Sequence, residues 1–253
     1  MTWRLVYASE VGTSHTHTDT PCQDSCWAQV DQFADGHPLL SVFVADGAGS
    51  AVKGGEGAEL AIEAAAAFVA KKVKQGEFGL GDNLATDIVL AVRESIYAAA
   101  EAHNLKARDF ACTFLGILST ASGTLVLQVG DGGVVIDVGA GLEVAVVPMS
   151  GEYANMTHFV TDEDAVTVLA SRSYPDRALK VAAFTDGIQR LALNMATNTP
   201  HEPFFAPFFN GMATATAEQE DQLQGLLVRF LGSAPVNERT DDDKTLVLAL
   251  WRA

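Results

Sequence analysis

Three aspartates that lie far apart along the chain each adjoin an apolar run of strand-like composition. Asp46 ends the run SVFVA, Asp186 ends the run KVAAFT, and Asp242 stands shortly before the run TLVLALW. A carboxylate beside a buried strand needs a partner, because burying an unpaired charge is costly. Glycine directly follows Asp46 and Asp186 and allows the backbone to turn sharply there. We therefore expect these strand ends to converge and their carboxylates to share a cation.

The elements that must position these aspartates are predicted from the periodicity of apolar residues. Helices are expected over residues 54–74, 83–103, 187–193 and 217–231, and loops over 11–24, 149–164 and 194–207. Strands are expected over residues 3–9, 25–30, 38–45, 111–119, 124–129, 134–138, 142–147, 166–171, 179–185 and 245–251. This order is not a repeated βα alternation. It favours an α+β sandwich in which helices cover antiparallel sheets.

The composition favours one soluble domain over residues 1–253, since 48% of the residues are hydrophobic and no linker-like segment divides the chain. A net charge of −16 argues against binding to nucleic acid or to an acidic membrane surface. We find no apolar stretch of about 20 residues and no signal peptide, and therefore expect a cytoplasmic protein. Three cysteines, Cys22, Cys26 and Cys112, do not form a disulfide framework and are expected to be reduced thiols.

Six short motifs follow one another along the chain. They are Cys22-Gln23-Asp24, Asp46-Gly47-Ala48-Gly49, Phe110-Ala111-Cys112-Thr113, Gly130-Asp131-Gly132, Thr185-Asp186-Gly187 and Asp242-Asp243-Lys244-Thr245. Each motif by itself is weak, because Asp-Gly is a common turn. In this order, however, the motifs resemble those of the metal-dependent type 2C serine/threonine protein phosphatases (PPM-type), and in particular their compact bacterial branch.

The resemblance implies a four-layer α-β-β-α sandwich of two antiparallel sheets flanked by helices, with two Mg²⁺ or Mn²⁺ ions at one end. It implies that Asp46 bridges both ions and that Gly47 offers its backbone carbonyl to one of them. Asp186 and Asp242 match ligands of the first ion, and Asp24 matches an acidic position that holds metal-bound water. The implied activity is hydrolysis of phosphoserine and phosphothreonine in phosphoproteins, the products of a serine/threonine kinase, by direct attack of a hydroxide between the ions.

The residue types suit this chemistry independently of the resemblance. Hard divalent cations prefer oxygen ligands, and Mg²⁺ keeps several waters rather than taking a full cage of protein ligands. A few aspartates and one carbonyl are therefore a sufficient set. Two such ions activate a water and offset the charge that develops on a phosphoryl group.

The chain departs from the family pattern at the position of a phosphate-binding arginine. The matching region, residues 12–17, contains no arginine, and its nearest candidates for the substrate phosphate are Ser14 and His15. Ala48 stands where many relatives have His or Met, and alanine cannot act as a general acid. We therefore expect the proton for the leaving group to come from His15 or from metal-bound water.

Two further departures concern the metals. Asp131 is a possible ligand of a third ion, but the acidic residue that such relatives carry after Asp186 is missing. Arg190 lies near that position and disfavours a third site. Asp243 replaces a more usual asparagine and adds negative charge.

Two alternative functions remain open at this point. A phosphatase fold without the family arginine is compatible with a catalytically impaired module that binds or regulates a partner. The segment His15-Thr16-His17-Thr18-Asp19 also resembles the zinc-binding motif of metallo-β-lactamase-like hydrolases. That motif is usually completed by a histidine directly after the aspartate, whereas this chain has Thr20 there.

Overall fold

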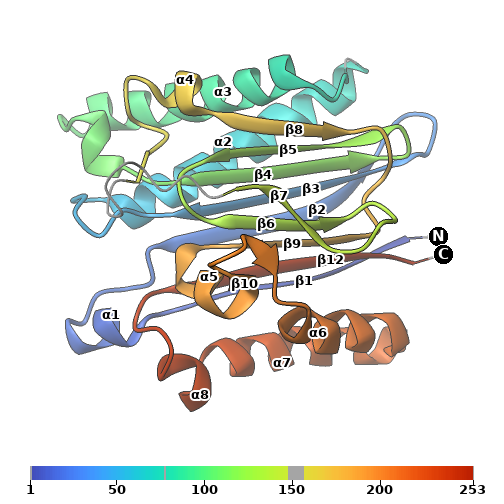
Figure 1. The fold of residues 1–253 in the computed structure, drawn as a ribbon. Coiled ribbons are helices and arrows are strands. Elements are labelled where there is room, and N and C mark those ends of the chain that lie inside the picture. Colours follow the sequence, from blue (N-terminus) through green and yellow to red (C-terminus); the bar gives the residue numbers. More distant parts are fainter. Residues whose placement is uncertain (1, 77, 148–156, 253) are drawn as a thin grey trace.

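The computed structural model describes residues 2–76, 78–147 and 157–252. Two five-stranded antiparallel sheets stack face to face, and helices cover the outer face of each (Figure 1). The four-layer α-β-β-α sandwich expected from the resemblance is therefore confirmed.

Both sheets combine segments that are distant in sequence. The first has the order β2-β3-β4-β5-β8 and contains β2 (Asp24–Gln32), β3 (Pro38–Asp46), β4 (Phe114–Thr120), β5 (Gly123–Val129) and β8 (Ala170–Tyr174). The second has the order β1-β12-β9-β6-β7 and contains β1 (Thr2–Glu10), β12 (Lys244–Arg252), β9 (Lys180–Phe184), β6 (Gly133–Asp137) and β7 (Glu143–Val146). A small additional pair contains β10 (Leu193–Asn194) and β11 (Thr199–Pro200).

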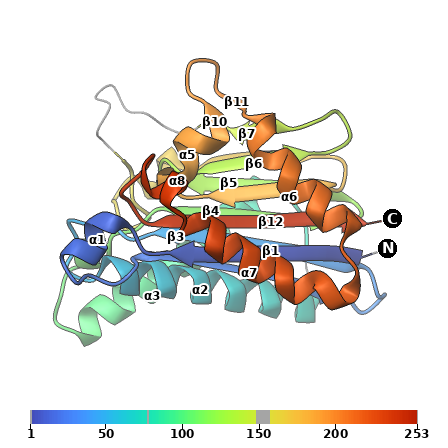
Figure 2. The same ribbon diagram turned by 90° about the horizontal axis from the view of Figure 1, so that it is seen from below.

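Helices form the two outer layers, which lie on opposite sides of the sheets (Figure 2). The first sheet is covered by α2 (Gly54–Gln75) and α3 (Asp82–Ala102), and the second by α5 (Asp186–Ala192), α6 (Glu202–Thr214) and α7 (Glu220–Leu231). Within the described ranges, no helix combines the length and the apolarity needed to cross a membrane. The short helices are α1 (Thr13–His17), η1 (Ala107–Phe110), α4 (Ala165–Val168), η2 (Ala217–Gln219) and α8 (Ala234–Asn237).

Strand β3 shows why the sequence contains continuous apolar runs. Its residues Leu39 and Phe43 pack towards α2 and α3, whereas Leu40, Val42 and Val44 pack between the two sheets. Successive side chains point to opposite faces of a strand, so a central strand that is covered on both faces is apolar at nearly every position. Such a strand carries the residue at its end to a fixed place at the edge of the sheet.

Several predicted elements differ from the structure. The four short strands predicted between residues 111 and 147 are divided between the sheets, with β4 and β5 in the first and β6 and β7 in the second. The predicted loop over residues 11–24 contains α1, and the predicted strand over 166–171 contains α4 before β8 begins. Of the irregular segment predicted over residues 149–164, residues 157–164 contain no helix or strand, and the rest lies outside the described residues.

The predicted loop over residues 194–207 is wrong, because it contains β10, β11 and the first half of α6. The segment contains prolines at positions 200, 203 and 207, and prolines are common in loops. However, Pro203 lies in the first turn of α6. The N–H groups of a first turn make no hydrogen bond within the helix, so proline loses nothing there by lacking one. Pro207 is tolerated inside the helix because Phe205, Phe209 and Met212 bury one face of α6 against the second sheet.

The fold predicts a strong effect for a substitution at Gly57 in α2. A Cβ atom there would lie 2.0 Å from the carbonyl oxygen of Phe110, an unrelaxed backbone contact. We expect Gly57→Ala to lower the free energy of unfolding by about 1–3 kcal/mol, as is typical of overpacking. Urea denaturation provides the measurement. Gly79→Ala is the matched control, since a Cβ at Gly79 meets nothing within 4 Å. Equal stability of the two variants would contradict the prediction.

Candidate active site

Four chain segments meet at one edge of the stacked sheets. Asp24 begins β2 and is paired in register with Asp46, which ends β3. In the second sheet, β9 leads directly into α5 at Asp186, and Asp242 and Asp243 immediately precede β12. β9 and β12 are antiparallel neighbours, so the end of the one lies beside the start of the other. The aspartates therefore come together from both sheets.

A cavity of about 230 Å³, which we call the acidic cavity, lies at this edge. Its lining includes Gly47, His15, Gln23 and Ala48. No lysine or arginine lines it within the described part of the chain. The carboxylates in its wall belong to Asp46, Asp131, Asp186, Asp242 and Asp243.

Asp24 lies beside this cavity and links the two sheets. Its Oδ2 accepts hydrogen bonds from the hydroxyl of Thr185 (2.7 Å), which directly follows β9 of the second sheet, and from the hydroxyl of Thr245 (2.8 Å) in β12. Its Oδ1 is buried and has no hydrogen-bond partner in the described structure. Asp186 likewise has a buried Oδ1 without a partner. Buried carboxylate oxygens of this kind need a donor or a cation.

Gly47 is confined by the backbone around it. A Cβ there would lie 2.3 Å from the carbonyl carbon of Gly54, so the turn after β3 admits only glycine. Its N–H donates to the carbonyl of Gln23 (3.1 Å), whereas no described residue donates a hydrogen bond to its own carbonyl oxygen. A backbone carbonyl beside clustered carboxylates is suited to binding a cation.

Burial, together with repulsion between neighbouring carboxylates, raises the pKa values of three carboxyl groups at the site. Burial raises the pKa of Asp24 to about 7, and the charges of Asp243 and Asp186 add to the effect. Burial, followed by the charges of Asp24, Asp186, Asp242 and Asp131, raises the pKa of Asp46 well above its usual range. Burial and the charges of Asp242 and Asp131 raise the pKa of Asp186 to about 6. A bound divalent cation would supply positive charge that stabilises the ionised forms of these carboxylates.

Asp243 has a scaffolding position that the sequence did not reveal. Its side chain is only 3% exposed. Oδ1 accepts the N–H of Gly12 (2.6 Å), and Oδ2 accepts the N–H of Gln23 (2.6 Å) and contacts Nδ1 of His15 (2.9 Å). Asp243 therefore fixes the segment before β2 and orients the imidazole of His15, which lines the acidic cavity. The one signal in the sequence was the departure from the usual asparagine.

The remaining predicted residues lie in different surroundings. Ser14 does not line the acidic cavity, and its hydroxyl donates to the carbonyl of Asp241 (2.7 Å). Asp131 does line it, where its Oδ2 accepts a hydrogen bond from the hydroxyl of Thr157. His17 and Asp19 are exposed and form no metal-binding group with His15, so the zinc hydrolase alternative lacks its ligand set.

Comparison with known proteins decides the family. A profile described as Protein phosphatase 2C matches residues 11–229. A protein of Escherichia coli (strain K12) named Serine/threonine-protein phosphatase 3 is 63% identical over 251 residues, covering 99% of each chain.

The chain belongs to the protein phosphatase 2C family. Among solved structures, a bacterial serine phosphatase with a point substitution superposes with a TM-score of 0.64 at 14% identity, covering 100% of both chains. The serine/threonine phosphatase Stp1 from Staphylococcus aureus gives 0.62 at 13% identity, covering 100% of this chain and 96% of that one. These similarities support the fold. The family resemblance and the enzyme class predicted from the sequence are confirmed.

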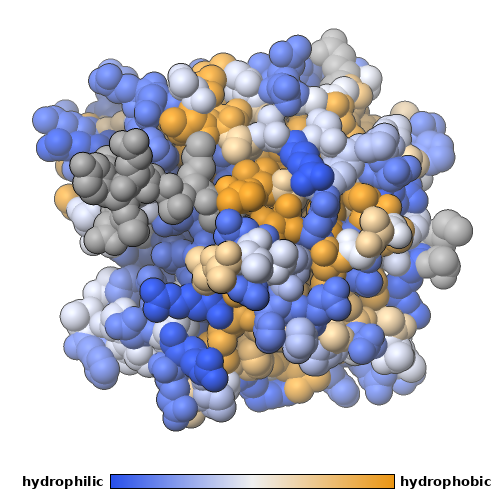
Figure 3. Space-filling model, viewed as in Figure 1, coloured by the Kyte–Doolittle hydropathy of each residue, from blue (hydrophilic) through white to orange (hydrophobic). Residues whose placement is uncertain are grey.

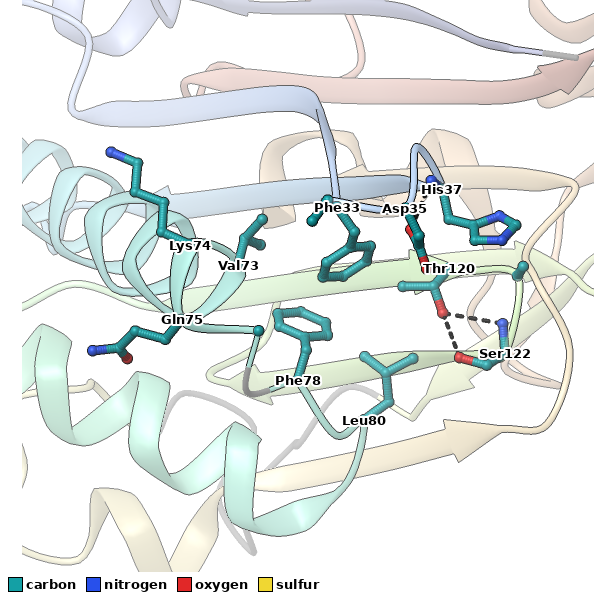
Figure 4. Close-up of a pocket in the computed structure, with 13 residues that line it drawn as sticks. Phe33, Asp35, His37, Val73, Lys74, Gln75, Phe78, Leu80, Thr120 and Ser122 are labelled. Carbon is teal, nitrogen blue, oxygen red and sulfur yellow. Dashed lines mark hydrogen bonds between the residues drawn. The ribbon is translucent and has the colours of Figure 1, made fainter.

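Two other clusters in this phosphatase do not have the features of the acidic cavity. A cavity of about 690 Å³ lies at the β2–β3 and β4–β5 turns, where Phe33 and Phe78 meet edge to face and Asp35 is the only carboxylate in its described lining (Figure 4). His158, Asp162 and Asp164 place potential ligand atoms within 4.8 Å of one another. In that group, however, Asp162 already accepts the N–H of Phe159 (2.8 Å).

The raised pKa values predict how the stability of the ion-free phosphatase depends on pH. Asp24 and Asp186 titrate at about 7 and about 6 in the folded state, against 3.8 ordinarily. The folded state therefore binds more protons between these values, and the free energy of unfolding falls as pH rises through this window. We expect EDTA-treated protein to melt at a lower temperature near pH 8 than near pH 5, and Mn²⁺ or Mg²⁺ to raise the melting temperature near pH 8.

Matched variants assign this effect to the cluster. Asp46→Asn removes one of the repelling charges, so its melting temperature without metal should depend less on pH, as measured by differential scanning fluorimetry. Asp87→Asn, an exposed position on α3 far from the acidic cavity, should behave like the wild type. Identical pH profiles for Asp46→Asn and Asp87→Asn would refute the prediction.

Proposed function

We propose that this chain is a metal-dependent phosphoprotein phosphatase that hydrolyses phosphoserine and phosphothreonine with two Mg²⁺ or Mn²⁺ ions. One observation carries the proposal: carboxylates from four chain segments surround a single cavity with no lysine or arginine in its described lining. The name of the Escherichia coli relative, a serine/threonine-protein phosphatase, supports the choice of substrate. Its substrates would be products of a serine/threonine kinase.

The residues present fit a pair of hard cations. We propose Asp46 as the ligand shared by both ions, with the Gly47 carbonyl, Asp186 and Asp242 as further ligands and Asp24 acting through water. Among the described residues, no three of these side chains place their ligand atoms within 4.8 Å of one another, so waters would complete the coordination of each ion. When bound, the ions would supply Lewis-acid activation of water and charge neutralisation at the phosphoryl group.

Asp131 also lines the acidic cavity and is a possible ligand of a third ion. Its carboxylate accepts from Thr157 and its backbone carbonyl accepts from Gln189 (2.8 Å). These contacts hold Asp131 in the cavity wall without a third ion. Binding of a third ion at Asp131 stays a prediction. We propose that the enzyme without substrate holds two ions.

His15 is proposed to handle the leaving-group proton. The contact of its Nδ1 with Asp243 favours the tautomer in which Nδ1 carries a proton, so Nε2 is the nitrogen available to substrate. The side chain is 19% exposed, which permits exchange of protons with solvent. Ala48 lines the same cavity and has no group that can donate a proton.

The extent and location of the enzyme are part of the proposal. We propose that residues 1–253 form one phosphatase domain, which is supported by the pairing of β1 with β12 along nine residue pairs. This pairing places the two ends of the chain in one sheet. Location in the cytoplasm stays a prediction.

The proposal predicts that Asp46→Asn abolishes phosphatase activity while the protein stays folded. Hydrolysis of p-nitrophenyl phosphate with added Mn²⁺ measures the activity, and circular dichroism checks the fold. Asp186→Asn and Asp242→Asn should require at least about tenfold more metal for half-maximal activity, since each removes one charged ligand. Asp87→Asn is the control. Wild-type protein that binds Mn²⁺ with no turnover would instead favour a binding module.

The proposed role of His15 predicts different losses for two substrates. The leaving group of phosphothreonine needs a proton, whereas p-nitrophenolate is a stable anion. We expect His15→Ala to lower kcat for a phosphothreonine peptide by about 10²-fold or more, and kcat for p-nitrophenyl phosphate much less. An equal loss of kcat on both substrates would contradict proton donation, and an equal rise of KM would point to phosphate binding.

A further inference from the structure

A second cavity adjoins the acidic cavity and leads away from it. It has a volume of about 220 Å³ and shares Asp186 and Asp242 with the acidic cavity. Its remaining wall includes Arg190 from α5 and Arg239, which follows α8. Asp186 and Asp242, which we propose as metal ligands, therefore separate the acidic cavity from a compartment that is lined by two arginines.

A third, larger hollow of about 730 Å³ continues from the same arginines. Arg190 and Arg239 line both compartments. Three partly buried phenylalanines, Phe204, Phe208 and Phe230, form its apolar wall, with ring centroids 5.2–6.0 Å apart. Figure 3 shows hydrophobic residues over α6 and α7 beside strongly hydrophilic residues over α5 and α8. We call the second and third compartments together the side groove.

The two arginines are free to bind a ligand. Both residues are exposed, and the described structure gives neither guanidinium a hydrogen bond or an ion pair. Asp241, which lines the same compartment, forms no ion pair with them. In a chain with 16 basic and 32 acidic residues, two unpaired arginines beside an acidic centre form a local surface that complements an anionic group.

We propose that the side groove binds the polypeptide of the phosphoprotein substrate. Arg190 and Arg239 pair with an acidic side chain close to the phosphorylated residue, and the phenylalanine wall takes a bulky apolar side chain further along. This inference rests on the proposed function and deepens it to a substrate class. The arginines do not line the acidic cavity, where the phosphoryl group reacts, so their contact is with the flanking peptide. Continuity of the compartments favours one substrate across both.

The length of α5 sets the spacing of the recognised sequence. Asp186 begins α5, and Leu193 and Asn194, which line the far compartment, directly follow it. Seven helical residues span about 10 Å. An extended peptide rises about 3.3 Å per residue, so the apolar side chain should lie about three residues from the phosphorylated residue, with the acidic residue between them.

A peptide series tests this arrangement. The probes are phosphothreonine peptides of otherwise glycine and alanine sequence, in which one phenylalanine is moved along each side and one glutamate is present or absent. We expect the wild type to show at least about tenfold higher kcat/KM for peptides with phenylalanine about three residues away on one side, and a further rise with glutamate. A flat dependence on the phenylalanine position would overturn the proposal.

Variants connect the preferences to the groove. Arg190→Gln/Arg239→Gln should remove the glutamate preference, and Phe208→Ala the phenylalanine preference, each measured as the ratio of kcat/KM between paired peptides. Lys71→Gln/Arg229→Gln removes the same charge elsewhere on the surface and should keep both preferences. Because ratios within one variant are compared, partial unfolding of Phe208→Ala does not mimic the result. Unchanged preferences in the groove variants would overturn the assignment.

The same data separate failure of this inference from failure of the proposed function. An active wild type without sequence preference overturns only the side groove. If the wild type hydrolyses neither these peptides nor p-nitrophenyl phosphate, the proposed function fails. The groove is then judged by fluorescence anisotropy with a labelled peptide that contains glutamate and phenylalanine. If the wild type and Arg190→Gln/Arg239→Gln bind the labelled peptide with equal affinity, the proposed role of the side groove is also wrong.

Discussion

Mutual repulsion among buried carboxylates is the constraint on which the rest of this structure depends. Asp24, Asp46 and Asp186 lie where burial and neighbouring negative charge favour their neutral forms. A folded chain tolerates such a cluster only if its scaffold is held firmly by other interactions or if cations neutralise it. An extensive apolar scaffold surrounds this cluster, and its oxygen donors are of the kind that hard cations prefer.

The scaffold consists of three apolar layers, one between the sheets and one between each sheet and the helices that cover it. Strands that are buried on both faces cannot shift in register without exposing apolar side chains. Their ends are therefore fixed, and the aspartates at those ends are fixed with them. Gly47 and Gly187 complete the arrangement, because backbone atoms approach both residues too closely for any side chain.

Two aspartates, Asp24 and Asp243, stabilise the site through hydrogen bonds. Asp24 joins the first sheet to Thr245 in β12 and to Thr185, which directly follows β9, and Asp243 holds Gly12, Gln23 and His15. These hydrogen bonds hold the chain segments that carry the other carboxylates of the acidic cavity in place. Outside the cavity the sign of the charge changes, since Arg190 and Arg239 lie beyond Asp186 and Asp242. A phosphorylated peptide with an acidic residue close to the phosphorylated one, as proposed above, would carry negative charge on both sides of that boundary.

The sequence by itself determined the family, the fold class and the aspartates that meet, because continuous apolar runs define buried strands and Asp-Gly motifs mark their ends. It failed where tertiary packing overrode local preference: the prolines of residues 194–207 indicated a loop, but burial of Phe205 and Phe209 stabilises α6 there. Only the tertiary structure decided that Asp243 orients His15, that Ser14 turns away to Asp241, and that Arg190 and Arg239 share one groove. These relations join residues up to 228 positions apart, and no local pattern of side chains records which distant partner a given residue contacts.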